Sequence, residues 1–172
     1  MTMRTDIWGE FEQADAQYNS IVGAVLNVKE FNKAAITSHS TRIEGSTLTL
    51  SEAINLIEKG TPATDKPIDH QNMVLDHYEA LEFVLEQAAK TTFVDFTLIQ
   101  SIASRTMRRT GRIVNSVLGN TDETLGDLRK VNVSAGGKYF IDQAKVSEML
   151  ERLIANINKN IGLVKSIPEV ID

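Results

Sequence analysis

Apolar residues recur at spacings of three and four along most of this chain, which places them on one face of an α-helix. Between residues 6 and 28 the pattern predicts a helix with one stripe facing a core, formed by Ile7, Phe11, Ala14, Tyr18, Ile21, Val22 and Val25. Residues 30 to 44 predict a second, weaker helix, because their stripe is partial and turns polar towards the end. Gly45 follows, and a glycine here is typical of a helix that ends in a left-handed residue.

The middle of the chain predicts three more helices. Thr49 and Glu52 have the spacing of a capping box, which begins a short helix. Residues 69 to 89 predict a helix that buries its stripe against the first helix, through Met73, Val74, His77, Leu81, Val84, Leu85 and Ala88. Asp95 begins a further helix that reaches about Arg109.

The remaining third of the chain combines a loop, a hairpin and a last helix. Residues 111 to 126 are rich in glycine and polar residues, and we expect an irregular surface loop there. Two β-prone runs flank residues 134 to 137 in VNVSAGGKYFI, which is typical of a β-hairpin. A strongly amphipathic helix is predicted from residue 143 to about 163, through Val146, Met149, Leu150, Leu153, Ile154 and Ile157. Residues 1–172 are therefore predicted to form a single all-α domain with one hairpin.

The composition narrows the class of protein. Of 172 residues, 42% are hydrophobic and 24% charged, as in one globular domain with a real core. The net charge of −5 gives no general basic field for phosphates, so we expect no nucleic-acid partner. The absence of Cys fits a reducing compartment. No apolar stretch approaches the roughly 20 residues that span a bilayer. We therefore expect a cytoplasmic protein without a membrane partner; the oligomeric state is left open, a homo-oligomer included.

Three features invite a chemical interpretation. His70 and His77 lie seven residues apart, roughly 10 Å along one helix, too far to share a metal ion, so we expect a half-buried His77 and no metal site. The Gly-Gly-Lys run ending at Lys138 lacks the rest of a phosphate loop and is better explained as a turn. Positive charge concentrates at Arg105, Arg108, Arg109 and Arg112. One interpretation is that these arginines are solvated and interact favourably with the exposed carbonyl groups at the C-terminal end of a helix. The alternative is that they form an anion-binding patch.

One segment matches a known sequence motif: Ser40-Thr41-Arg42-Ile43-Glu44-Gly45. It resembles the Ser/Thr-x-x-x-Glu-Gly/Asn inhibitory motif of the Fic (filamentation induced by cAMP) family. The resemblance extends over roughly residues 30 to 160, because three segments look like those that precede the catalytic loop in bacterial Fic proteins. These segments are TRIEGSTLTLSEAINLIEKG, KPIDHQNMVLDHYEALEFV and TGRIVNSVLGNTDETLGDLRKVNVSAGGKYFI.

The resemblance implies a Fic-like helical domain with a β-hairpin flap. It implies an inhibitory-helix region over about residues 1–60 and a Fic core over about residues 66–172. Members of this family transfer AMP from ATP, with Mg²⁺, to a hydroxyl of a target protein. Their catalytic loop reads His-Pro-Phe-x-Asp/Glu-Gly-Asn-Gly-Arg, in which His is the general base and the acidic residue holds the metal. ATP and Mg²⁺ are thus the implied cofactors, and a target protein with an acceptor hydroxyl is the implied partner.

This sequence departs from the family at the catalytic loop. No His precedes a Pro, and no Gly-Asn-Gly-Arg occurs. We therefore expect a truncated Fic core with no catalytic residue in this chain, and a missing C-terminal catalytic portion that carries the chemistry. The absence of a central helix would leave an apolar face of the last helix uncovered. The alternative is a non-catalytic interaction module, or an inhibitor that acts in trans on a separate Fic chain.

The resemblance assigns an inhibitory role to Ser40, Glu44 and Gly45. In the family, a second Arg follows the Gly-Asn-Gly-Arg of the catalytic loop by a few residues. Glu44 would pair with this second Arg and occupy space that the γ-phosphate of ATP needs. Ser40 lies one turn earlier on the same helix face, and Gly45 lets the chain leave without a clash. The alternative is a solvated carboxylate two residues from Arg42, a spacing at which two side chains do not face each other.

The hairpin at residues 131 to 141 corresponds to the flap of the family, whose edge pairs with an extended target segment. An ordinary structural hairpin is the equal alternative. The candidate target-binding residues are Val131, Asn132, Val133, Lys138, Tyr139 and Phe140.

Overall fold

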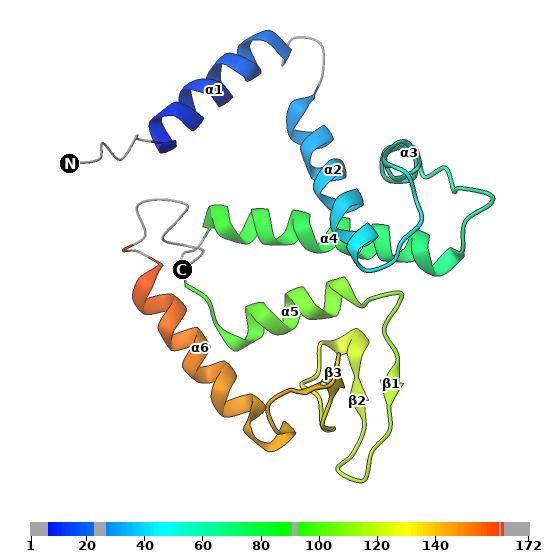
Figure 1. Ribbon diagram of the computed structural model, residues 1–172, viewed down its shortest axis with the longest axis vertical. Helices are drawn as coiled ribbons and strands as arrows, with labels where there is room; N and C mark the ends of the chain where they lie inside the picture. Colours follow the sequence, from blue (N-terminus) through cyan, green and yellow to red (C-terminus); the bar gives the residue numbers. More distant parts are fainter. Residues whose placement is uncertain (1–6, 23–26, 91–92, 162, 164–172) are drawn as a thin grey trace.

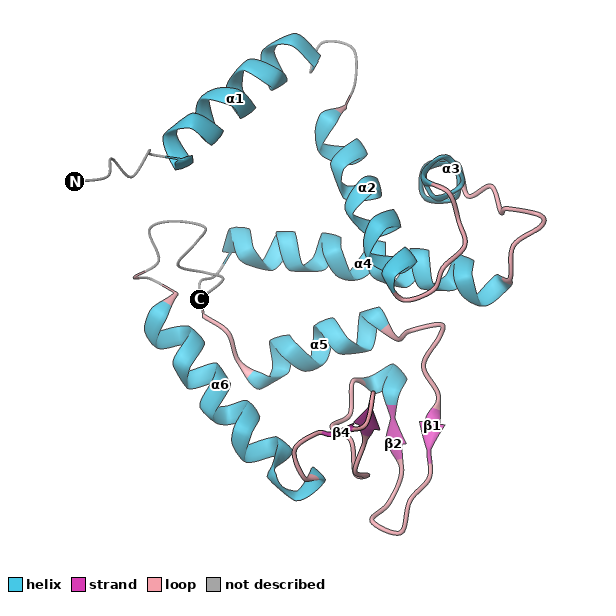
Figure 2. Ribbon diagram, in the orientation of Figure 1, coloured by secondary structure: helices cyan, strands magenta, loops and turns pink. Residues whose placement is uncertain are grey.

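The computed structural model describes residues 7–22, 27–90, 93–161 and 163, and helices dominate it (Figure 1). The helices are α1 (Ile7–Val22), α2 (Val28–Ile43), α3 (Leu50–Lys59), α4 (Ile68–Lys90), α5 (Phe96–Thr106) and α6 (Val146–Asn160), with short 3-10 turns η1 (Glu123–Leu125) and η2 (Gln143–Lys145). Two small antiparallel hairpins pair β1 (Ile113–Val114) with β2 (Thr121–Asp122) and β3 (Ser134–Ala135) with β4 (Lys138–Tyr139) (Figure 2). The predicted helical class is confirmed.

Helix ends follow the local signals in the sequence. The capping box of α3 is present, with the Thr49 N–H donating to Glu52 Oε2 at 2.7 Å and the Glu52 N–H to Thr49 Oγ1 at 3.3 Å. Asp95 caps α5, because its Oδ1 accepts the Leu98 N–H at 2.7 Å. α5 ends at Thr106, earlier than the predicted end near Arg109.

The core lies around α4, which has α2 and α3 on one side and α5 on the other (Figure 1). Its centre is formed by Leu48, Ala53, Leu56 and Val74. We expected the stripe of α4 to pack against the first helix, and that expectation is wrong: α4 packs against α2, α3 and α5.

The first helix is shorter and more exposed than predicted. α1 ends at Val22, and Val25, which was placed on its stripe, lies outside the described residues. Ala14 and Tyr18 are exposed, and Ile21 retains 67% of its accessible surface. The expectation that these residues face a core is therefore wrong.

The segment from 111 to 126, expected as an irregular loop, contains a second hairpin. Ile113 pairs with Asp122 and Val114 with Thr121, and η1 follows. Strands of two residues are too short to show an alternating pattern, so the sequence gives no signal for them. The segment is fastened to α5, because Gly126 approaches so closely that a Cβ there would lie 2.4 Å from the Gln100 carbonyl oxygen.

The predicted hairpin is confirmed, with shorter strands. Ser134 pairs with Tyr139 and Ala135 with Lys138. The turn consists of Gly136 (φ +56°) and Gly137 (φ +76°), the two positive values that a type I′ hairpin turn requires.

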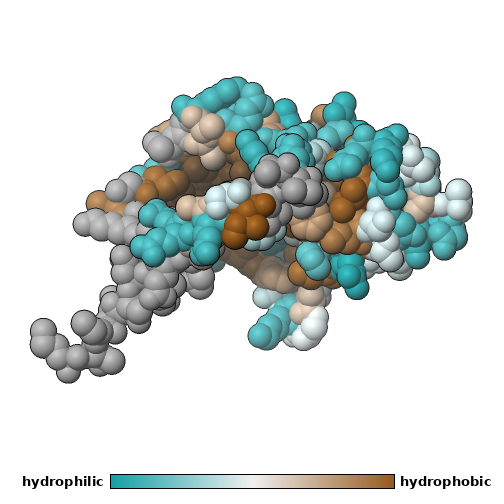
Figure 3. All heavy atoms as spheres, turned by 90° about the horizontal axis from the view of Figure 1, so that it is seen from above, coloured by the Kyte–Doolittle hydropathy of each residue, from teal (hydrophilic) through white to brown (hydrophobic). Residues whose placement is uncertain are grey.

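The last helix, α6, begins at Val146 and is tied to the start of α5 by an amide pair. Asn158 Oδ1 accepts the Val94 N–H at 2.8 Å, and Asn158 Nδ2 donates to the Val94 carbonyl at 2.6 Å. Met149 is exposed and Leu153 retains 52% of its accessible surface. Two residues of the predicted apolar stripe of α6 are therefore exposed, and the other four are partly buried. Figure 3 shows apolar side chains exposed among polar ones on the face seen from above.

Candidate functional site

The candidate inhibitory motif lies at the C-terminal end of α2, which α4 positions through a small and mostly polar face. The buried residues of α2 are Val28, Lys33, Ala34, Thr37, Ser38 and Thr41. Thr41 Oγ1 donates to the Thr37 carbonyl at 2.9 Å, so the hydroxyl is satisfied within the helix. Thr37 Oγ1 lies 3.2 Å from Nδ1 of His77 on α4. His77 is half-buried, as predicted, and this burial lowers the pKa of its imidazole.

An ionic cluster fixes the first half of α2 on α4. Lys33 Nζ lies 2.7 Å from Glu30 Oε2 and 2.8 Å from Glu82 Oε1, and 5.3 Å from the centre of the Tyr78 ring. The Tyr78 hydroxyl donates to Glu30 Oε2 at 2.9 Å. Burial alone would lower the pKa of Lys33, but the hydrogen bonds to Glu30 and Glu82 outweigh it and raise that pKa. Lys33 therefore stays charged at the contact between the two helices.

The end of α2 is a Schellman motif. The Gly45 N–H donates to the Arg42 carbonyl at 3.1 Å, and the Ser46 N–H donates to the Thr41 carbonyl at 2.9 Å. Gly45 has a φ of +102°, which confirms the predicted left-handed end. An added Cβ would meet no atom within 4 Å, so glycine is needed there for its backbone conformation and not for space.

Glu44 is the residue on which this helix ends, and its side chain is exposed. Across the described residues its carboxylate has no hydrogen bond and no ion pair, with Arg42 or with any other cation. Ser40, one turn earlier, is half-buried. The site thus presents a carboxylate to its surroundings from a well-defined helix end.

The chain that leaves the motif returns at once to α4. Ser46 Oγ donates to the His70 carbonyl at 3.4 Å, and the Thr47 N–H donates to His70 Nδ1 at 3.2 Å. Leu48 then enters the core. Thr41 and Ser46 are therefore the nearest buried residues on the two sides of Glu44, while Glu44 itself is exposed.

The candidate flap residues lie away from this motif, with α4 and α5 between them in Figure 1. Lys138 and Tyr139 form β4, and Phe140 extends the ladder because its N–H donates to the Val133 carbonyl at 3.1 Å. Tyr139 retains 89% of its accessible surface.

The two flap residues that precede Val133 lie before β3 and have structural contacts. Asn132 Oδ1 accepts the Gln143 N–H at 2.8 Å, and the Val131 carbonyl accepts from Arg129 Nη1 at 2.7 Å. The edge that a peptide could join is therefore short, and it runs along β4.

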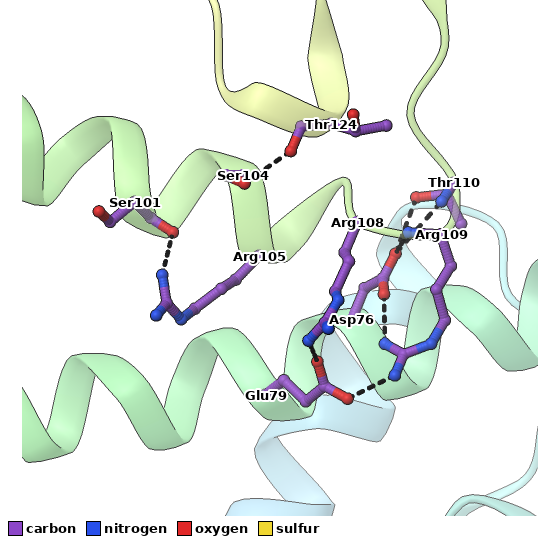
Figure 4. Close-up of polar contacts among 9 residues, drawn as sticks. All are labelled: Asp76, Glu79, Ser101, Ser104, Arg105, Arg108, Arg109, Thr110 and Thr124. Carbon is purple, nitrogen blue, oxygen red and sulfur yellow. Dashed lines mark hydrogen bonds and ion pairs between the residues drawn. The ribbon is translucent and has the colours of Figure 1, made fainter.

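Two arginines of the cluster, Arg108 and Arg109, form ion pairs with α4 (Figure 4). Arg112 is 84% exposed and lies 3.9 Å from Glu123. Arg109 Nη2 lies 2.5 Å from Glu79 Oε1, and Arg108 Nη1 donates to Glu79 Oε2 at 3.1 Å. Arg105 Nη1 donates to the Ser101 carbonyl at 2.9 Å. The hydrogen bond from Arg109 lowers the pKa of Glu79. Carboxylates of the chain itself thus take up much of this positive charge.

Asp76 is the buried centre of that cluster, with 0% of its side chain exposed. Its Oδ1 accepts from Arg109 Nη1 at 2.7 Å. Its Oδ2 accepts the Arg109 N–H at 2.7 Å, the Thr110 N–H at 3.2 Å and the Thr110 hydroxyl at 3.3 Å. One carboxylate therefore holds the turn after α5 against α4.

Sequence reasoning missed Asp76, Lys33 and the contacts of His70. The only signal is that Asp76 directly precedes His77, which belongs to the predicted apolar stripe of the helix. Apart from Glu30, which lies three residues from Lys33, the partners of these residues come from segments 23 to 49 positions away in the chain.

The described residues contain neither a candidate metal site nor a candidate membrane span. Within the part of the chain that the structure describes, no three His, Cys, Asp or Glu side chains group together as metal ligands would. The helices described there are also too short or too polar to cross a bilayer.

Comparison with known proteins gives no identification: neither a family model nor a curated protein matches this chain.

Proposed function

We propose that this chain is the regulatory N-terminal portion of a Fic-type protein adenylyltransferase, in which Glu44 restrains AMP transfer. One observation carries the proposal: the Glu44 carboxylate is exposed and lacks a partner among the described residues, while the turn that holds it is closed by a hydrogen bond between two buried residues, Thr41 and Ser46. A carboxylate held in this way is suited to meet a cation that another segment supplies. The similarity of residues 40 to 45 to the Fic inhibitory motif makes an arginine of the catalytic loop that cation.

The proposed inhibition is electrostatic and steric. Two opposite unit charges about 4 Å apart attract by about 4 kcal/mol at an effective dielectric of about 20, before desolvation is subtracted. An arginine that pairs with Glu44 is withdrawn from the phosphates of ATP. The carboxylate also places a like charge in the space of the γ-phosphate, so the nucleotide is held away from its reactive position.

ATP and Mg²⁺ belong, in this proposal, to the catalytic portion. The described residues of this chain do not fit a Mg²⁺ site, because no cluster of carboxylate or imidazole ligands is found among them. The contribution of this chain is therefore control of access to the nucleotide and not the chemistry of transfer.

The hairpin is proposed to receive the target protein. Lys138 and Tyr139 form an exposed edge, and strand addition there would fix an acceptor hydroxyl through main-chain hydrogen bonds. The shortness of β4 favours a brief, weakly sequence-dependent contact.

The proposal is tested by reading the gene past codon 172 for a segment that encodes His-Pro-Phe and Gly-Asn-Gly-Arg. In that product, Glu44→Gly and Glu44→Gln should raise labelling of protein by α-labelled ATP. Glu58→Gln is the matched control, since Glu58 is an exposed carboxylate near the end of α3. It should leave labelling unchanged.

Two results would count against the proposal. A stop codon directly after codon 172 would favour inhibition in trans, and the chain would then have to slow an active Fic enzyme when the two are mixed. Equal labelling by wild type and both Glu44 variants would remove the inhibitory role of Glu44.

A further inference from the structure

One residue of α4, His70, contacts the segment that follows Glu44 through both its side chain and its backbone carbonyl. His70 Nδ1 lies 3.2 Å from the Thr47 backbone nitrogen and 3.0 Å from Thr47 Oγ1. The His70 carbonyl accepts from Ser46 Oγ at 3.4 Å. Both contacts cross more than twenty positions of sequence, so they join the exit of α2 to a separate helix.

The contact with Thr47 defines the tautomer of the imidazole. A backbone N–H can only donate, so Nδ1 must be the unprotonated nitrogen and the ring proton must reside on Nε2. Nδ1 is therefore an acceptor that serves the protein backbone, and it is not available to a metal ion.

This attachment bears directly on Glu44. The Ser46 N–H closes the end of α2 on the Thr41 carbonyl at 2.9 Å, so Glu44 lies within a loop whose two ends are Thr41 and Ser46. Thr41 is fixed by the packing of α2, and Ser46 and Thr47 are fixed by His70. Among the described residues, the Glu44 side chain makes no hydrogen bond or ion pair that would hold it in place.

We infer that His70 is the positioning residue for Glu44: its Nδ1 fixes the exit of α2, and so the direction in which the carboxylate points. The inference has two halves. The structural half, that His70 fixes the backbone around Glu44, concerns this chain alone. The functional half, that His70 thereby affects AMP transfer, rests on the proposed inhibitory role of Glu44.

The structural half is tested by amide hydrogen exchange on three variants. His70→Ala and His70→Phe both remove the acceptor, and His70→Phe keeps most of the volume of the ring. His70→Asn keeps an acceptor, because its side-chain oxygen takes the place of Nδ1. The amides of Gly45, Ser46 and Thr47 should exchange about tenfold faster in the first two variants and at the wild-type rate in His70→Asn, the factor expected for one net hydrogen bond.

Asp95→Ala is the control, since it removes the cap of α5 and should leave these three amides unchanged. If His70→Ala does not fold, His70→Phe carries the test. Acceleration of Thr47 alone, with Gly45 and Ser46 unchanged in the folded variants, would overturn the inference, because His70 would then hold only its direct partner.

The functional half is tested by labelling in the complete gene product. His70→Phe should raise AMP transfer, His70→Asn should restore the wild-type rate, and His70→Phe should add nothing to Glu44→Gln. If Glu44→Gln raises labelling and His70→Phe does not, the inference about His70 fails alone. If Glu44→Gln has no effect, the proposed function fails, while the exchange result stands separately.

Discussion

Replacing Asp76 by Asn should destabilise the chain strongly, because its buried carboxylate holds the turn after α5. Asn can offer one oxygen to the three donors on the Oδ2 side, the Arg109 N–H and the N–H and hydroxyl of Thr110. Its amide group would then face Arg109 Nη1, which places a donor against a donor.

The cost can be bounded from the geometry. Removing one partner of a buried ion pair costs about 3–5 kcal/mol. The Arg109 side chain remains 32% exposed, so water recovers part of its solvation, and we expect the lower end, about 3 kcal/mol. Asp76→Ala also leaves two backbone N–H groups without an acceptor and should cost about 5 kcal/mol.

The measurement is urea unfolding followed by circular dichroism at fixed pH. At a slope of about 2 kcal/mol per molar urea, Asp76→Asn should lower the midpoint by about 1.5 M. Asp69→Asn is the control, because Asp69 is an exposed carboxylate in the first turn of the same helix. Its loss should cost less than about 1 kcal/mol, the size of a helix-dipole interaction. Equal midpoints for the two variants would refute the assignment of Asp76 as the centre of this contact.

Three further predictions concern stability. Thr49→Ala removes the hydroxyl half of the capping box and should cost about 1 kcal/mol by urea unfolding; no change would show that the box is not formed. Ser38→Ala should raise stability by about 0.5–2 kcal/mol, because the buried Ser38 hydroxyl finds no partner in the described structure; a lower melting temperature would contradict this. Because the pKa of His77 is lowered in the folded state, the contribution of neutral His77 to stability is fully present above the unfolded-state pKa of 6.5 and is lost as pH falls through the folded-state pKa. His77→Asn should lose this part of the pH dependence of the unfolding free energy between pH 7.5 and 5.5. An unchanged slope would contradict the prediction.

Much of the helical architecture could be predicted because its signals are local. The Thr49 and Asp95 caps and the glycine after Glu44 act within one turn of chain, and the structure contains each of them. The hairpin turn was equally local, because two adjacent glycines supply the positive φ values that it needs.

The errors have a common cause, which is that periodicity shows a stripe but not its partner. The stripe of α4 was real, yet its neighbours are α2, α3 and α5 and not α1. The hairpin of β1 and β2 depends on Gly126 approaching α5 and on Ser104 Oγ donating to the Thr124 carbonyl at 2.6 Å. Contacts of this kind join distant segments, so no window of sequence shows them.

The candidate site also has a part that local sequence predicts and a part that it does not. The place of Glu44 at a helix end could be predicted from the motif and from Gly45. Its support could not, because His70 and the ionic cluster around Lys33 belong to the contact between α2 and α4. A polar contact face gives no apolar stripe, which is why the second helix looked weak in the sequence.

The central claim is that the Glu44 carboxylate excludes the γ-phosphate of ATP, and nucleotide affinity tests it most directly. Calorimetry on the complete gene product should compare ATP with ADP for wild type and Glu44→Gln. The account predicts that the substitution tightens ATP binding about tenfold and leaves ADP binding unchanged. The factor is what remains of the attraction between Glu44 and the arginine, a few kcal/mol, after the cost of desolvation is subtracted. An equal change for both nucleotides, or none for either, would contradict it.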